Sequence, residues 1–322
     1  KRAIDIAYNR IYKFHSLQKF KNISYKDKFN NKLDYKYLPL DSVAIYVPGS
    51  TASYPSSVLM NAIPAIVAGV KRIVMINPGH KGKQDSAVLY AARKCKIKEI
   101  YAIGGPSAIA AVAYGTKKIK KVNKIVGPGN IYVAAAKKEV FGDVGIEGMI
   151  AGPSEVTIIA DKSSNFNLLA TSMIAQSEHG PNSQSILVSK DLNIIKETKK
   201  KIFDLVKNLP RKKIILNSLK KNGLLILAKN DHQIIDIINL ISPEHLEIVT
   251  RNFNKYVNKV INAGSIGLGK YSPVAASDYN VGPNHTLGTL GSTRYSSGLN
   301  LSDFYKKISV FNLSKKGIEV IG

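Results

Sequence analysis

Residues 43–76 read VAIYVPGSTASYPSSVLMNAIPAIVAGVKRIVMI, and this stretch predicts the fold of the chain. It begins with an apolar, β-branched run at 43–47 and ends with another at 72–76, both typical of short buried strands. Between the two runs, residues 56–70 carry apolar side chains at helical spacing. A strand, a helix and a strand in this order form a βαβ unit with parallel strands. The stretch therefore predicts an α/β fold.

The same alternation continues along the chain in two series. The first series adds expected strands at 99–103 and 124–126, with alanine-rich helices at 85–95 and 105–115. The second series has expected strands at 156–160, 185–188, 224–227 and 246–249, and expected helices at 165–178, 192–208 and 232–241. Two successive series predict two Rossmann-like, incomplete βαβ domains with largely parallel sheets.

The 322 residues suffice for two domains with sizeable cores. We expect one domain over 44–154 and a second that combines 1–43 with 155–300. Residues 301–322 are expected to begin a C-terminal tail. Beyond residue 263 the chain is rich in Gly, Ser, Pro, Asn and Tyr, and a long loop of this kind is more often functional than idle.

The net charge of +25 raises the question of a nucleic-acid partner. The lysine clusters at 117–121, 199–201 and 211–213 are dispersed, lack interleaved aromatic residues and accompany no nucleic-acid motif. A solvated basic surface is therefore favoured over a basic nucleic-acid-binding protein. No apolar run approaches the roughly 20 residues of a membrane span, and no signal peptide is expected. The only cysteine, Cys95, fits a reducing cytoplasm.

The segment AQSEHGP at 175–181 closes the expected helix over 165–178. Upstream apolar residues mark an inward-facing stripe, namely Phe166, Leu169, Ala170 and Met173. Gln176 and His179 continue this stripe and, being three residues apart, are expected on one helix face. An amide and an imidazole aimed inward before a Gly-Pro stop indicate half of a metal site. A hydrogen-bonded buried polar pair explains the segment equally well.

Glycine-rich turns follow three of the expected strands in the first half of the chain. They lie at 48–51, 104–105 and 127–130, at the carboxyl ends of strands, where α/β proteins bind ligands. None forms a Gly-x-Gly-x-x-Gly fingerprint, and each alone is more typical of an ordinary tight turn. Together they favour a nucleotide-sized ligand.

Seven segments, taken in order, resemble the histidinol dehydrogenase family. They are YVPGSTASYPSSVLM (46–60), GGPSAIAAVAYGT (104–116), KIVGPGNIYVAAAK (124–137), AGPSEV (151–156), AQSEHGPNSQ (175–184), SPEHLEIV (242–249) and SDYNVGPNHTL (277–287). The resemblance implies a cytoplasmic, zinc-dependent enzyme that oxidises L-histidinol to L-histidine through histidinaldehyde with two NAD. It also implies the last step of histidine biosynthesis and a homodimer whose active site is shared between subunits.

The resemblance also assigns roles to individual residues. The zinc ligands would be Gln176, His179 and Asp278, and Glu244 and His245 match the catalytic acid–base pair. The cofactor-binding residues are Tyr46, Ser107 and Asn130. The substrate-binding residues are Ser154, Gln176, His179, His245 and Asp278.

The chemistry of these residue types agrees with the implied reaction. A histidine suits removal of the hydroxyl proton as hydride leaves, and the adjacent Glu244 can activate water for the second oxidation. An alternative is that Ser242-Pro243-Glu244 simply begins a helix. The resemblance favours catalysis. A route through Cys95 is disfavoured because no partner base accompanies it, while His285 is expected to line the site and Arg294 is left without an assigned role.

The sequence departs from the family's pattern at three places. Ser107 stands where the family has a glutamine that hydrogen-bonds NAD, and Pro48-Gly49-Ser50 replaces a Pro-Gly-Gly turn. We also expect family segments before residue 1 and after residue 322; the latter supplies a substrate-contacting glutamate and a fourth zinc ligand, a histidine, from the partner subunit. Related dehydrogenases that oxidise other polar alcohols are the alternative enzyme class.

Overall fold

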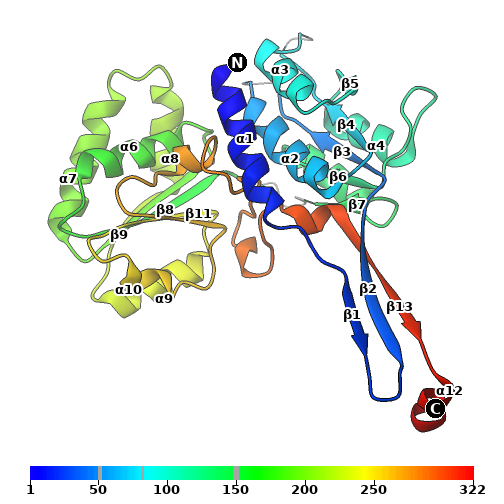
Figure 1. Cartoon of the computed structure of the whole chain (residues 1–322). Coiled ribbons are helices and arrows are strands. Elements are labelled where there is room, and N and C mark those ends of the chain that lie inside the picture. The colour runs from blue at the N-terminus through cyan, green and yellow to red at the C-terminus, as the bar shows by residue number, and fades with distance from the viewer. Residues whose placement is uncertain (50–52, 81–82, 148–151) are drawn as a thin grey trace. The chain divides into compact units, whose positions relative to one another are not determined.

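The computed structural model describes residues 1–49, 53–80, 83–147 and 152–322 (Figure 1). The chain divides into two compact units. Unit 1 comprises Lys1–Glu147 and Asn300–Gly322, and unit 2 comprises Gly148–Leu299. Within the described ranges, no helix is both long and apolar enough to cross a membrane.

Unit 1 contains a five-stranded parallel sheet. Its strand order is β5 (Glu99–Tyr101), β4 (Arg72–Ile76), β3 (Ser42–Tyr46), β6 (Lys124–Val126) and β7 (Gly145–Ile146). The connecting helices are α2 (Pro55–Ala68), α3 (Ser86–Lys94), α4 (Gly105–Tyr114) and α5 (Ile131–Glu139). All five residues of β3 are buried, as expected of a central strand covered on both faces. The strand order reverses between β3 and β6.

Unit 2 contains a second five-stranded parallel sheet. Its order is β10 (Gly223–Leu227), β9 (Gln184–Ser189), β8 (Glu155–Ala160), β11 (His245–Val249) and β12 (Ser265–Leu268). The helices are α6 (Phe166–Ser177), α7 (Leu192–Val206), α8 (Lys212–Asn222), α9 (Asp231–Ile241), α10 (Asn254–Val257) and α11 (Val274–Ser277). Two buried apolar clusters form its core, one around Leu169 and Leu187 and one around Ile186 and Ile238.

The two sheets share one winding pattern, in which three strands run outward in chain order and the fourth returns beside the first. Each unit is thus Rossmann-like. The switch point, where the strand order reverses, lies between β3 and β6 in unit 1 and between β8 and β11 in unit 2. The predicted α/β class with two largely parallel sheets is confirmed. In both units, every predicted strand and helix lies within a few residues of an observed element.

A third sheet is antiparallel and is not predicted by the sequence analysis. It consists of β1 (Ile23–Lys26), β2 (Lys32–Pro39) and β13 (Tyr305–Asn312), which run side by side as a long ribbon (Figure 1). In register, Tyr35 of β2 lies opposite Ile23 on one side and Ser309 on the other. The remaining elements of unit 1 are α1 (Arg2–Ser16), α12 (Lys315–Ile321) and the 3-10 turn Leu301–Phe304.

The expected domain boundaries differ from the observed units at both ends of the chain. Residues 1–43, expected in the second domain, belong to unit 1, and so do residues 301–322. Asp5 of α1 accepts hydrogen bonds from Tyr90 and pairs with Lys94 at 2.8 Å, which fixes α1 on α3. The backbone of Leu40 bonds to that of Phe304 in the same unit. The sequence pattern could not reveal these contacts because they join distant segments.

Candidate active site

The candidate catalytic residues lie at the amino edge of the unit 2 sheet. Glu155 is the first residue of β8 and His245 the first of β11, and these parallel strands are neighbours. Helix α6 connects the parallel strands β8 and β9, so it must run back and end near the same edge. Gln176 lies in its last turn. The chain therefore brings segments around residues 155, 176 and 245 to one edge.

Glu244 is a buried carboxyl group that is bound to Glu155. Its Oε2 accepts a hydrogen bond of 2.8 Å from the backbone N–H of Glu155, while a carboxylate oxygen of Glu155 accepts one of 3.4 Å from the backbone N–H of Glu244. The other oxygen of Glu155 accepts from Leu290 at 2.9 Å. Burial raises the pKa of Glu244 well above its usual value, and the negative charges of Glu155 and Asp278 raise it further. Glu244 therefore favours its protonated form.

The conformation around Glu244 excludes the alternative of a helix start at Ser242-Pro243-Glu244. Helix α9 ends at Ile241, and Ser242 adopts a left-handed conformation with φ of 53°. His245 then begins a buried strand. The chain thus passes directly from α9 into β11, and Glu244 lies immediately before the first residue of that strand.

His245 is oriented by hydrogen bonding at one ring nitrogen. Its Nδ1 lies 2.8 Å from the Oγ of Ser265, the first residue of β12, and its Nε2 lies 3.8 Å from Oε1 of Glu244. Burial lowers the pKa of His245 to about 3, with smaller effects from His285 and His179. The imidazole is therefore neutral at pH 7. The sequence analysis missed Ser265, because only the pairing of β11 with β12 brings it beside His245.

The side chains of Gln176 and His179 differ in burial, although their helical spacing predicts one shared, inward-facing side of the helix. Gln176 is 4% exposed, and its buried Nε2 has no hydrogen-bond partner. His179 lies beyond the helix, which ends at Ser177, and its side chain is exposed. His179 is therefore not part of the buried helix face that the spacing predicts, although its imidazole lies close enough to those of His245 and His285 to lower their pKa values. The helix ends at Ser177 with Glu178 as its C-cap. Gly180 and Pro181 follow, and proline cannot continue a helix.

A buried glutamate links the segment that carries Asp278 to β11 and α6. Asp278 follows the short helix α11, whose first amide, that of Val274, donates to Oε1 of Glu247 at 2.8 Å. The same oxygen accepts from Ser172 of α6 at 3.2 Å, so Glu247 ties α6, β11 and α11 together. Burial raises the pKa of Asp278 to about 6. Sequence reasoning missed Glu247, whose position in β11 resembles that of an ordinary strand residue.

The remaining predicted residues of unit 2 occupy neighbouring positions. Ser154 is half-buried and immediately precedes β8. His285 is half-buried, its Nε2 is without a hydrogen-bond partner, and burial lowers its pKa to about 4. Arg294 donates to the carbonyl of Leu240, which is a structural role. Within the described residues, no three His, Cys, Asp or Glu side chains are grouped closely enough to hold a metal ion.

The candidate cofactor residues lie at the carboxyl edge of the unit 1 sheet. Tyr46 ends β3, is 4% exposed, and its hydroxyl accepts a hydrogen bond of 3.1 Å from the backbone of Gly105. Ser107 is exposed in the first turn of α4. Asn130 caps α5 by accepting hydrogen bonds from the backbone of Tyr132 and Val133. Tyr46 thus orders the loop that precedes Ser107.

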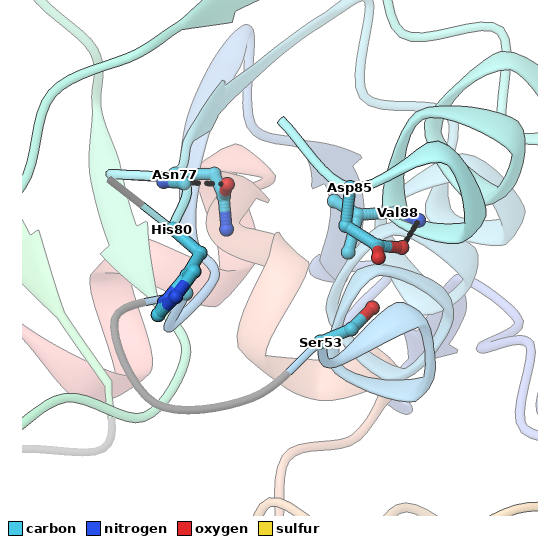
Figure 2. A pocket seen from close by; sticks show the side chains of 7 residues that line it. Ser53, Asn77, His80, Asp85 and Val88 are labelled. Carbon is cyan, nitrogen blue, oxygen red and sulfur yellow. Dashed lines mark hydrogen bonds between the residues drawn. The ribbon is translucent and has the colours of Figure 1, made fainter. Parts of the chain in front are cut away.

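A cavity of about 270 Å³ opens at the same edge, beyond β3 and β4 (Figure 2). It is lined by Gly49, Ser53, Asn77, Gly79, His80, Asp85 and Val88. The Nδ2 of Asn77 donates to the carbonyls of Val47 and Pro48, and its Oδ1 accepts from Gly79 at 3.0 Å. Asn77 therefore joins the two loops that form the cavity. Sequence analysis singled out only the Pro48-Gly49-Ser50 turn here, and Ser50 lies outside the described residues.

Two Rossmann-like sheets, each with a reversal of strand order, define a doubly wound α/β protein. Comparison with known proteins gives the family. The histidinol dehydrogenase family model matches residues 1–322. Histidinol dehydrogenase of Pelagibacter ubique is 69% identical over 322 residues, which are 100% of this chain and 75% of that protein. The enzyme of Acinetobacter baylyi is 45% identical over 317 residues, covering 98% of this chain and 74% of that protein.

Solved structures give the same result. The crystal structure of histidinol dehydrogenase from Elizabethkingia anophelis has a TM-score of 0.95 at 40% identity, covering 99% of this chain and 74% of that one. An acetylating aldehyde dehydrogenase from Geobacillus thermoglucosidasius has a TM-score of 0.62 at 15% identity over 96% of this chain and 83% of that one, which is a likeness of fold. The chain belongs to the histidinol dehydrogenase family, a family of oxidoreductases.

Proposed function

We propose that this protein oxidises L-histidinol to L-histidine through histidinaldehyde, with two NAD and one zinc ion, as the last step of histidine biosynthesis in the cytoplasm. The observation that carries the proposal is the pairing of Glu244 with His245 at the amino edge of unit 2. Both side chains are buried, and Nε2 of His245 lies 3.8 Å from Oε1 of Glu244. A protonated carboxyl group beside a neutral imidazole places a proton donor and a proton acceptor in one buried site.

The chemistry of the residues fits a zinc ion. Gln176, His179 and Asp278 would supply an amide oxygen, an imidazole nitrogen and a carboxylate oxygen, all of which are zinc donors. The buried Nε2 of Gln176 has no hydrogen-bond partner, as expected of an amide whose function is to bind something else. Rotation of this amide by half a turn exchanges its nitrogen and oxygen. When bound, zinc would polarise the substrate's hydroxyl and fix its orientation.

Glu244 and His245 divide the proton transfers in this proposal. His245 is neutral and Ser265 holds its Nδ1, so Nε2 is available to take the hydroxyl proton in the first oxidation. In the second oxidation, Glu244 acts as the base that activates water on the aldehyde. Both His245, which carries the hydroxyl proton after the first oxidation, and Glu244, which is protonated at rest, must release their protons to solvent before Glu244 can act as this base.

Binding of the substrate and NAD involves the remaining candidate residues. Ser154 would contact the substrate together with Gln176, His179, His245 and Asp278. NAD would bind at the carboxyl edge of unit 1, where Tyr46, Ser107 and Asn130 lie and where doubly wound sheets receive nucleotides. A homodimer with a shared active site is part of the proposal. The chain spans about three quarters of the length of its curated relatives.

Product stoichiometry tests the reaction. Supplied with limiting L-histidinol and excess NAD, the protein should form two NADH per histidinol without accumulating free aldehyde. A yield of one NADH would contradict the four-electron assignment, and faster oxidation of another polar alcohol would favour the alternative substrate class.

A separate measurement tests the metal site. Zinc retained after gel filtration should fall when Gln176 is changed to Ala. The matched control is Gln233→Ala, because Gln233 lies in α9 and its side-chain oxygen accepts a hydrogen bond from the backbone N–H of Lys229, just before that helix. Equal zinc content in both variants would remove Gln176 from the ligand set.

A further inference from the structure

Lys137 of α5 is a buried lysine that the proposed reaction does not use. Its side chain is 1% exposed, whereas lysine is almost never fully buried without a partner. The Nζ donates to the backbone carbonyl of Gly127 at 2.5 Å and to that of Glu147 at 3.2 Å. One ammonium group thus binds two segments that are 20 residues apart in the chain.

The first of these segments is the loop 127–130, at the switch point of the unit 1 sheet. Gly127 has φ of 103°, and a Cβ atom there would collide with the backbone oxygen of Tyr46 in the neighbouring strand. Gly129 approaches α5 so closely that a Cβ atom would collide with Val133. The loop is therefore confined between β3 and α5, and the carbonyl of Gly127 is the group that Lys137 holds.

The second segment contains Glu147, where the first of the two chain stretches of unit 1 ends. Glu147 follows β7, and its amide donates to the carbonyl of Ile125 in β6. Its carboxylate pairs with Lys124 at 3.3 Å, and Lys124 also donates to the carbonyl of Asp303. Lys137 consequently ties the loop to a segment that is itself anchored to β6.

We propose that Lys137 is a positioning residue for the dinucleotide: its ammonium group holds the 127–130 loop in the conformation that receives NAD. The inference rests on the proposed function in unit 1. A buried lysine that only filled space would be replaceable by methionine, which has similar length and no charge. The charged Nζ of Lys137 instead donates to the carbonyl of Gly127, in the loop that also contains Asn130. Removal of the Lys137 ammonium group should therefore weaken NAD binding selectively.

The test compares Lys137→Met with Lys138→Met, since Lys138 is the next residue of α5 and is exposed. Lys137→Met should raise the NAD dissociation constant, measured by calorimetry, by roughly 10- to 100-fold, as expected for hydrogen bonds from a charged donor. KM for NAD should rise in parallel, while kcat at saturating NAD and the affinity for histidinol should change less than twofold. Lys138→Met should behave as the unsubstituted protein does.

Lys137→Gln provides a milder variant in case the methionine variant does not fold, because glutamine keeps one N–H donor. It should give an intermediate NAD affinity at an unchanged circular dichroism spectrum. Equal NAD affinity in folded Lys137→Met, Lys137→Gln and Lys138→Met would overturn the positioning role alone. Failure of the unsubstituted protein to bind NAD would overturn the proposed cofactor and this inference with it.

Discussion

Glu155 and Glu244 hold each other in place through reciprocal contacts between backbone and side chain: the N–H of each points to a carboxylate oxygen of the other, at 2.8 and 3.4 Å. Because they lie at the starts of adjacent strands, neither contact is visible in the sequence. The arrangement fixes the Glu244 side chain next to His245. It also places two buried carboxyl groups close together, which favours protonation of Glu244.

Glu244→Gln and His245→Asn should affect different steps of the proposed reaction. Glutamine keeps an oxygen that can accept from the Glu155 N–H, and it resembles the protonated carboxyl group but cannot act as a base. Glu244→Gln should therefore impair oxidation of supplied histidinaldehyde more than the first hydride transfer, whereas His245→Asn should impair the alcohol step at least as severely. Losses of about 10²- to 10⁴-fold are typical of such groups. Single-turnover NADH formation from each substrate measures both steps, and equal, mild losses would contradict the assignment.

Ser265→Ala should lower turnover by releasing His245. The serine hydroxyl is 2.8 Å from Nδ1, and a neutral hydrogen bond contributes about 0.5–1.5 kcal/mol, so kcat should fall roughly two- to tenfold. Zinc content and thermal stability should stay close to those of the unsubstituted protein. Ser302→Ala, at an exposed position in unit 1, serves as the control. An unchanged kcat would show that packing alone orients the imidazole.

Ser107→Gln should tighten NAD binding modestly. Ser107 is exposed in the first turn of α4, so a longer side chain can be accommodated there and can reach further. One additional hydrogen bond corresponds to roughly a tenfold lower dissociation constant or less. Calorimetry with NAD measures the change. Abolished binding would mean that the pocket around Pro106 and Ser107 differs from the family's arrangement.

Cys95 should resist alkylation until unit 1 unfolds. The thiol is 3% exposed, and burial raises its pKa to about 12, so the reactive thiolate is disfavoured in the folded protein. The unfolded chain has the lower thiol pKa, near 9; this group's contribution to stability is therefore complete below about pH 9 and is lost as the pH rises towards 12. Iodoacetamide labelling at pH 8.5 with and without urea checks this. Rapid labelling of the folded protein would contradict the burial.

The sequence predicts the parallel sheets well because their central strands are buried on both faces. The run at 72–76, for example, coincides with β4, since a central parallel strand needs continuous apolar residues. By contrast, β2 and β13 are largely exposed and pair across some 270 residues of sequence, so no local pattern identifies them. The periodicity of apolar residues reports local structure and does not show which distant strands pair.

The candidate site is predictable only in part, for the same reason. Glu244 and His245 form a recognisable motif, and Gln176 interrupts an apolar stripe. Glu155 and Ser265, however, gain their roles from neighbouring strands, and each alone resembles an ordinary residue at a strand start. Helical spacing does not describe His179, because the helix has already ended, with Glu178 as its C-cap.

The ribbon that joins β2 to β13 has a consequence for the order of events during synthesis on the ribosome. Unit 2 is one continuous segment, whereas unit 1 needs Leu301 and Phe304, both fully buried, and β13 from the far end of the chain. At about 5–20 residues per second, these arrive roughly 10–30 s after Glu147 has been made. The edge of β2 that pairs with β13 should therefore stay open until the second unit has been made.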